Sequence, residues 1–184
     1  MLELNWKGTM EVPLPDGTTR LSTTDGIRLK HYLSASTMSE YAVVDQASAI
    51  LLPDDVPFEV ASIIGCAVLT GTGAVLNTAQ VPPGSSAAVI GCGGVGLSAI
   101  MGCKLAGCYP IIAVDVMESK FAFARELGAT HTIDSRATNA IEALREVTKG
   151  GPDFIFDSVG AAVTIDEALR GVRPGRTAVI MGVH

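Results

Sequence analysis

Short apolar runs alternate with amphipathic stretches throughout the second half of the chain. Between the apolar runs, residues such as Phe121, Ala124 and Leu127 recur at helical spacing before a glycine. Apolar strands that alternate with such helices are typical of a parallel sheet covered on both faces, so the pattern predicts a doubly wound α/β domain. The five predicted strands, whose first residues are 23, 20, 23 and 24 positions apart, are Ala87–Ile90, Pro110–Asp115, Thr130–Ile133, Asp153–Phe156 and Thr177–Met181.

The first 58 residues have a different texture, with turn signals and short β-like runs. Pro15-Asp16-Gly17 predicts a turn, and Glu40–Val44 and Ala49–Leu52 predict short strands. These few strands cannot form a barrel or sandwich by themselves. Between the two halves, Phe58–Gln80 is apolar on all sides and predicts a buried bridging helix, which ends before the turn at residues 82–84.

Residues 60–103 form a run of 44 positions without Asp, Glu, Lys or Arg. By length, residues 60–79 and 87–103 could form a membrane hairpin. However, no Lys or Arg flanks the first segment, and four glycines crowd residues 91–96 of the second. Fully buried parallel strands read as the same kind of apolar run, so the sequence favours a protein without a membrane partner.

Composition and charge narrow the class of protein further. The chain has 184 residues, a net charge of −6, 48% hydrophobic residues and 17% charged residues, which is too apolar for disorder. Without a run of Lys or Arg, we expect no nucleic-acid partner. The four cysteines form no C-x-x-C pair and the N-terminus lacks a signal peptide, so we expect a reducing, cytoplasmic location.

A glycine-rich loop directly follows the first strand of the repeating pattern. Gly91, Gly93 and Gly96 form a G-x-G-x-x-G motif that opens a predicted helix. In this motif the first glycine permits a tight turn, the second leaves room for a diphosphate, and the third lets helix and strand pack closely. The free N–H groups and the dipole of the helix attract the anion, so the loop predicts a dinucleotide site.

An acidic residue ends the next strand. Asp115 lies 22 residues after Gly93, where a carboxylate can bind the hydroxyl groups of the adenosine ribose. It would repel a 2′-phosphate, and no arginine follows it in residues 116–118, so NAD is favoured over NADP. Alternatively, Asp115 is only a helix N-cap. A methyltransferase domain would also place an acidic residue here, but residues 85–90 lack the acid that such domains usually carry before the glycine loop.

Several further motifs make the chain recognisable from about Gly17 onwards. Residues 64–74 read IGCAVLTGTGA, and the glycine loop continues into LSAIMGCK at residues 97–104. ELGAT at residues 126–130 and SVG at residues 158–160 follow in register. Together these motifs resemble the zinc-dependent medium-chain alcohol dehydrogenases.

The resemblance implies two domains and a redox reaction. Residues 1–66 would belong to a partial, β-rich GroES-like catalytic domain, and residues 67–184 to a Rossmann-type domain with five of the family's six strands. In the family, zinc polarises an alcohol oxygen while hydride passes between the alcohol or aldehyde and NAD. The full-length enzyme would be a homo-oligomer.

The resemblance also implies a role for individual residues. Cys66 would be a catalytic zinc ligand and Thr70 would lie beside the nicotinamide, while Tyr32 and Leu33 would shape the substrate pocket. The residues that would bind the cofactor are Gly91, Gly93, Gly94, Val95, Gly96, Asp115, Lys120, Ser158, Val159, Met181, Gly182 and Val183.

The sequence departs from the family at the metal site. The family's other two zinc ligands, a cysteine in G-x-C-H/R-[ST]-D and a histidine in G-H-E, have no counterpart, and the four-cysteine structural zinc lobe has none either. We therefore expect a fragment that is inactive alone and does not hold zinc. One alternative is a non-catalytic NAD-binding module. Another is a zinc-free reductase of the same superfamily, although such a protein need not keep a thiol at Cys66.

Overall fold

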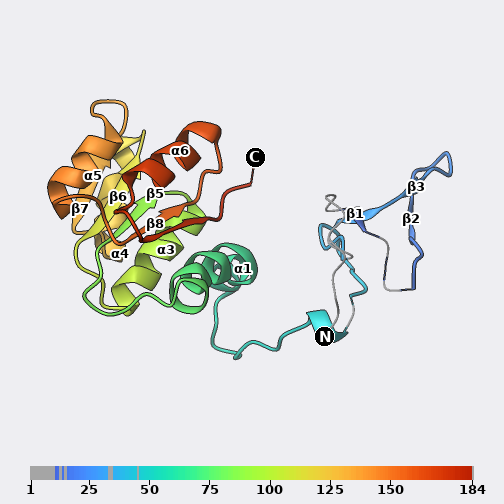
Figure 1. The fold of residues 1–184 in the computed structure, drawn as a ribbon. Helices are drawn as coiled ribbons and strands as arrows, with labels where there is room; N and C mark the ends of the chain where they lie inside the picture. Colours follow the sequence, from blue (N-terminus) through green and yellow to red (C-terminus); the bar gives the residue numbers. More distant parts are fainter. Residues whose placement is uncertain (1–10, 13, 15, 33–34, 45, 184) are drawn as a thin grey trace. The chain divides into compact units, whose positions relative to one another are not determined.

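The computed structural model describes residues 11–183 except 13, 15, 33–34 and 45, and it divides the chain into two compact units (Figure 1). The first unit extends to Asp55 and the second begins at Val56. Residues 56–66 therefore pack within the second unit. The family-based domain boundary after residue 66 stays a prediction.

The first unit contains two short antiparallel ribbons. β1 (Glu11–Val12) pairs with β4 (His31–Tyr32), and β2 (Leu21–Ser22) pairs with β3 (Arg28–Leu29). A single 3₁₀ turn, η1 (Gln46–Ser48), follows them.

The strands predicted at Glu40–Val44 and Ala49–Leu52 are wrong. Both segments form bends and irregular chain. Their apolar side chains are exposed, Tyr41 and Leu51 by more than 90%, and among the described residues no strand pairs with either segment. A β-like run without a partner strand cannot satisfy its backbone groups in a sheet, so propensity alone did not decide the structure.

The second unit is built on a five-stranded parallel sheet. The strand order is β7-β6-β5-β8-β9, which places the first strand of the unit at the centre. The predicted doubly wound sheet is confirmed, and every predicted strand agrees with the structure within one residue at each end. The strands are β5 (Ala87–Ile90), β6 (Ile111–Asp115), β7 (His131–Asp134), β8 (Phe154–Asp157) and β9 (Thr177–Ile180).

Helices cover both faces of this sheet (Figure 1). α3 (Gly94–Leu105) and α4 (Phe121–Leu127), which follows the 3₁₀ turn η4 (Glu118–Lys120), pack on one face, and α5 (Ala140–Thr148) and α6 (Ala162–Gly171) on the other. Side chains alternate along β5, so Ala87 and Val89 join the first core and Ala88 and Ile90 the second. Because both faces are buried, all four residues are apolar.

One continuous helix precedes the sheet. It comprises α1 (Phe58–Ile63), the π-helical η2 (Ile64–Val68), α2 (Leu69–Gly73) and the π-helical η3 (Ala74–Thr78), which agrees closely with the predicted Phe58–Gln80. Small residues bring it against α3: a Cβ added at Gly71 would overlap the carbonyl oxygen of Val95 and lie 2.6 Å from Ser98 Cβ. Its opposite face, including Leu69, is exposed within this unit. Burial of the helix between the two halves of the chain stays a prediction.

The same helix is long and apolar enough to cross a membrane by length and composition, with a mean hydropathy of 1.7. A core helix of a water-soluble domain passes the same criterion. The membrane hairpin considered above is wrong in its second arm, because residues 87–90 form the central strand β5 and residues 94–105 form α3. The absence of a membrane partner stays a prediction.

We expect Gly71→Ala to destabilise the second unit, because the new methyl group must push the helix away from α3. Overpacking of this kind lowers the free energy of unfolding by about 2 kcal/mol, which urea denaturation can measure.

Gly65→Ala in the same helix is the matched control, since a Cβ there meets no atom within 4 Å. Alanine is the better helix former, so this variant should gain up to about 1 kcal/mol. Equal effects of the two substitutions would contradict close packing at Gly71.

Candidate functional site

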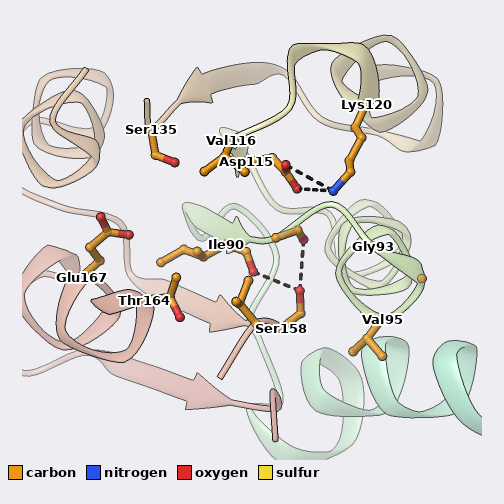
Figure 2. Close-up of a pocket in the computed structure, with 13 residues that line it drawn as sticks. Ile90, Gly93, Val95, Asp115, Val116, Lys120, Ser135, Ser158, Thr164 and Glu167 are labelled. Carbon is orange, nitrogen blue, oxygen red and sulfur yellow. Dashed lines mark hydrogen bonds and ion pairs between the residues drawn. The ribbon is translucent and has the colours of Figure 1, made fainter. Parts of the chain in front are cut away.

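A groove of about 470 Å³ lies at the carboxyl ends of the central strands (Figure 2). The strand order reverses between β5 and β8, and ligands of open α/β sheets bind at such a switch point. The groove is lined by Ile90, Gly91, Gly93, Gly94, Val95, Asp115, Val116, Lys120, Ser135, Ser158, Val159, Thr164 and Glu167.

The glycine loop forms one wall and owes its shape to two close approaches. Gly91 has φ +91°, and a Cβ there would lie 2.7 Å from Ser158 Oγ. A Cβ at Gly96 would overlap the carbonyl oxygen of Gly91. Both positions therefore exclude any side chain, and the chain turns sharply from β5 into α3.

Gly93 serves a different purpose, because a Cβ there would meet nothing within 4 Å and would project into open space. It precedes the first turn of α3, and no side chain caps that helix. The N–H groups of the first turn have no partners within the helix, and the helix dipole adds partial positive charge. This end of the groove therefore suits an anion that approaches the backbone closely.

Asp115 lies beside the loop at the end of β6 (Figure 2). Its Oδ2 accepts a hydrogen bond from Cys92 N at 2.7 Å, and its Oδ1 accepts one from Met117 N at 2.9 Å. Lys120 Nζ lies 3.0 Å from Oδ2 and 3.2 Å from Oδ1. The carboxylate thus joins the glycine loop to the segment that begins η4. The alternative that Asp115 is only a helix N-cap is wrong, because Met117 is the N-cap of η4 and no side chain caps it.

These donors decide the charge of Asp115. Burial raises the pKa of this carboxyl, but the hydrogen bonds from Cys92, Lys120 and Met117 lower it, and the pKa lies below its ordinary value. Burial raises the pKa of the neighbouring Cys92 thiol to about 11, and the charge of Asp115 contributes. At neutral pH the groove therefore carries a carboxylate, and the Cys92 thiol, which is buried beside the groove and is not part of its lining, stays protonated.

β8 closes the groove from the other side. Ser158 Oγ lies 2.9 Å from the carbonyl oxygen of Ile90 and 3.0 Å from that of Gly91, so its hydroxyl can donate to either one. The preceding residue, Asp157, is fully buried and accepts hydrogen bonds from the N–H groups of Val159 and Gly160. The loop that carries Ser158 and Val159 is therefore held at both ends.

The end of β9 meets this loop through two glycines. A Cβ at Gly160 would lie 2.5 Å from the carbonyl carbon of Gly182. The N–H groups of Met181 and Gly182 also donate to the carbonyl oxygen of Asp157. The structure therefore brings Met181, Gly182 and Val183 to the loop after β8, although they do not line the groove itself.

The residues expected at the metal and substrate sites lie elsewhere. Cys66 and Thr70 are exposed on the helix that precedes the sheet, one turn apart. A Cβ at Gly94 would lie 3.3 Å from Ala67 Cβ, so this part of the helix contacts the start of α3. Tyr32 is exposed in the first unit, and Leu33 lies outside the described residues.

Three residues that line one side of the groove are not marked by any motif in the sequence. Ser135, Thr164 and Glu167 line it, and Asp157 holds the adjoining loop by accepting a hydrogen bond from Val159 N. Ser135 directly follows β7, which is a position that could have been found from the rule that carboxyl ends of parallel strands share an edge. Thr164 and Glu167 face the groove only because of how α6 packs, and no local signal marks them.

The chain is similar to several known proteins in sequence and in structure. The sequence profile of the zinc-binding dehydrogenases matches residues 94–184. An alcohol dehydrogenase zinc-binding domain protein from Burkholderia ambifaria is 38% identical, with a TM-score of 0.84 over 92% of this chain and 46% of the other. Benzyl alcohol dehydrogenase from Acinetobacter calcoaceticus is 32% identical, with a TM-score of 0.81 over 89% and 46%.

A third structure was solved with a dinucleotide. It is a putative zinc-binding dehydrogenase from Sinorhizobium meliloti 1021 bound to NADP, 30% identical, with a TM-score of 0.61 over 64% of this chain and 35% of the other. This chain therefore spans less than half the length of each of these three structures.

We expect the stability contributed by Asp115 to depend on pH. Because its folded-state pKa is lowered, the contribution is present above the unfolded-state pKa of about 3.9 and is lost as the pH falls through the folded-state value. Asp115→Asn cannot pair with Lys120 in the same way. It should lower the free energy of unfolding at pH 7 by about 2 kcal/mol, and the gap to the wild type should close in acid.

Urea denaturation between about pH 3 and pH 7 measures this gap. Asp166→Asn, which removes an exposed partner of Arg170, is the control and should change the free energy of unfolding by less than about 0.5 kcal/mol. A gap for Asp115→Asn that stays constant into acid would refute the assignment.

Proposed function

Because this chain belongs to the zinc-binding dehydrogenase family, we propose that its groove binds a nicotinamide adenine dinucleotide and that the whole protein is an alcohol dehydrogenase. The observation that carries the proposal is the uncapped start of α3 beside the ionised Asp115, at the switch point of the sheet. The family is one of oxidoreductases. The reaction would be hydride transfer between a small alcohol or aldehyde and the cofactor.

The diphosphate of the cofactor would lie against the first turn of α3. The N–H groups of Gly94 and Val95 would donate to its oxygens, and the empty space beside Gly93 lets it approach the backbone. Ser158 would act indirectly, by holding the carbonyl groups of Ile90 and Gly91 and hence the shape of the loop.

The adenosine ribose would bind at Asp115. Its hydroxyl groups would donate to the carboxylate, which the Cys92 and Met117 N–H groups hold in place and keep ionised. Lys120 already contacts both carboxylate oxygens, so it would share or yield one of these positions and donate to a ribose oxygen. The negative charge of Asp115, without an arginine at Val116, supports NAD over NADP.

The nicotinamide ring, which accepts or supplies the hydride when the cofactor is bound, would lie toward the ends of β8 and β9. Val159 lines the groove there, and Met181, Gly182 and Val183 contact the same loop through Gly160. Thr70 would complete this side from the preceding helix. These residues orient the ring and exclude water.

Zinc does not fit the described residues. Among them, no group of three or more His, Cys, Asp or Glu side chains lies close enough to hold a metal ion, and Cys66 would contribute a single thiol. The lack of a metal-ligand group among the described residues favours a second candidate function, a module that binds the dinucleotide without catalysis. A zinc-free reductase is the less favoured alternative, because such a protein need not keep a thiol at Cys66.

The relatives support a small-molecule substrate. One similar structure is a benzyl alcohol dehydrogenase, which supports an alcohol as substrate. Tyr32 and Leu33 would contribute to its pocket. The homo-oligomer is proposed from the family resemblance, and the cytoplasmic location from the unpaired pattern of the four cysteines. No run of Lys or Arg suggests a nucleic-acid partner.

We expect calorimetry to detect binding of one NADH per chain and weaker binding of NADPH. Asp115→Ala should weaken NADH binding at least tenfold, since a charged acceptor for ribose hydroxyls is lost. Asp115→Ser combined with Val116→Arg should raise the affinity for NADPH relative to NADH, because arginine can pair with the 2′-phosphate.

Asp166→Asn is again the control, because its side chain lies outside the lining of the groove. If none of the Asp115 variants alters the affinity for either dinucleotide, the nucleotide site is misplaced.

We also expect the purified chain to hold well below one equivalent of zinc and to form no NADH from an alcohol, because one thiol binds zinc weakly. Metal analysis after dialysis and an absorbance assay measure both. Stoichiometric zinc that disappears in Cys66→Ser would overturn this expectation and favour a complete metal site.

A further inference from the structure

One end of the groove is polar and is formed by residues other than the glycine loop and Asp115. Ser135, Thr164 and Glu167 lie there, opposite Gly93 and Val95, and the side chain of Val116 lies between (Figure 2). They come from three different parts of the fold: the residue after β7, the residue after β6, and α6. Tertiary packing alone brings them together.

Glu167 is the unusual member of this group. It is half-buried, and among the described residues no N–H or O–H group donates a hydrogen bond to its carboxylate. The closest basic residue along α6, Arg170, pairs instead with Asp166 at 3.2 Å. Burial raises the pKa of Glu167, and the charges of Asp157 and Asp166 raise it further. The carboxylate therefore has no hydrogen-bond donor among the residues that the structure describes.

The proposed function determines what lies next to this carboxylate. If the diphosphate binds at the start of α3 and the ribose binds at Asp115, the base continues along the groove toward Val116. The partly exposed Val116 side chain offers an apolar surface for the flat face of the base. Figure 2 shows the carboxylate of Glu167 directed toward this same end of the groove, so it would face an edge of the base.

Resting on the proposed function, we propose that Glu167 accepts a hydrogen bond from the exocyclic amino group of adenine and so selects an aminopurine dinucleotide. The amino group is a donor, which is what the unpaired carboxylate requires. A 6-oxo purine would instead turn a carbonyl oxygen toward the carboxylate, and two acceptors repel each other. Glu167 would thus determine specificity for the base and would not take part in hydride transfer.

The test compares two dinucleotides that differ only at this group. Calorimetry on the whole chain measures the dissociation constants of NADH and of reduced nicotinamide hypoxanthine dinucleotide, in which the amino group is replaced by an oxo group. Wild-type protein should prefer NADH at least about tenfold, because the analogue leaves the acceptor unpaired. In Glu167→Gln the preference should fall below about threefold, since the amide can also donate to the oxo group.

Controls separate this role from a structural one. Asp166→Asn, on the adjacent exposed position of α6, should keep the wild-type preference. Glu167→Ala should lose the preference while retaining a cooperative melt, and it replaces Glu167→Gln if that variant does not fold. Equal affinity of the wild type for the two dinucleotides, or an unchanged preference in the Glu167 variants, overturns the proposal while leaving the nucleotide site intact. Failure of both dinucleotides to bind refutes the proposed function and this inference together.

Discussion

Around the first two turns of α3, backbone segments pack in direct contact, because glycines have no side chain to keep the segments apart. Gly96 lies against the carbonyl group of Gly91, and Gly71 brings the preceding helix against Val95. A third contact joins Gly160 to Gly182 at the ends of β8 and β9. These approaches set the position of the uncapped helix terminus, and a side chain at any of them would displace a wall of the groove or the helix behind it.

Asp115 depends on the same geometry and also reinforces it. Its carboxylate ties Cys92 in the glycine loop to Met117 and Lys120 beyond β6. The backbone proposed to bind the diphosphate and the carboxylate proposed to bind the ribose therefore form one hydrogen-bonded unit. The donors that position the carboxylate also keep it ionised. A negative charge beside a diphosphate site is unfavourable by itself, and the N–H groups and the ammonium group around Asp115 offset it.

The second unit holds the groove proposed to bind a dinucleotide, whereas the described residues include no group of three or more side chains that could hold a metal ion. Cys66 and Thr70 lie on the helix that contacts α3, close in sequence to the residues that make this contact. Polarisation of an alcohol oxygen requires ligands that the described residues do not supply. The proposed binding of the cofactor therefore depends on residues of the second unit alone and does not require a metal ion.

The strands and the glycine loop could be predicted from the sequence because their signals are local. A buried parallel strand such as β5 must be apolar at every position, and a turn such as Gly91–Gly96 must be glycine where no side chain fits. The Glu40–Val44 and Ala49–Leu52 segments misled the prediction, since a strand also needs a partner and their composition does not reveal one. Glu167, Thr164 and Asp157 became visible only in the folded chain. Whether a residue on a helix faces a groove depends on how that helix packs against segments distant in sequence, and a single sequence does not record that packing.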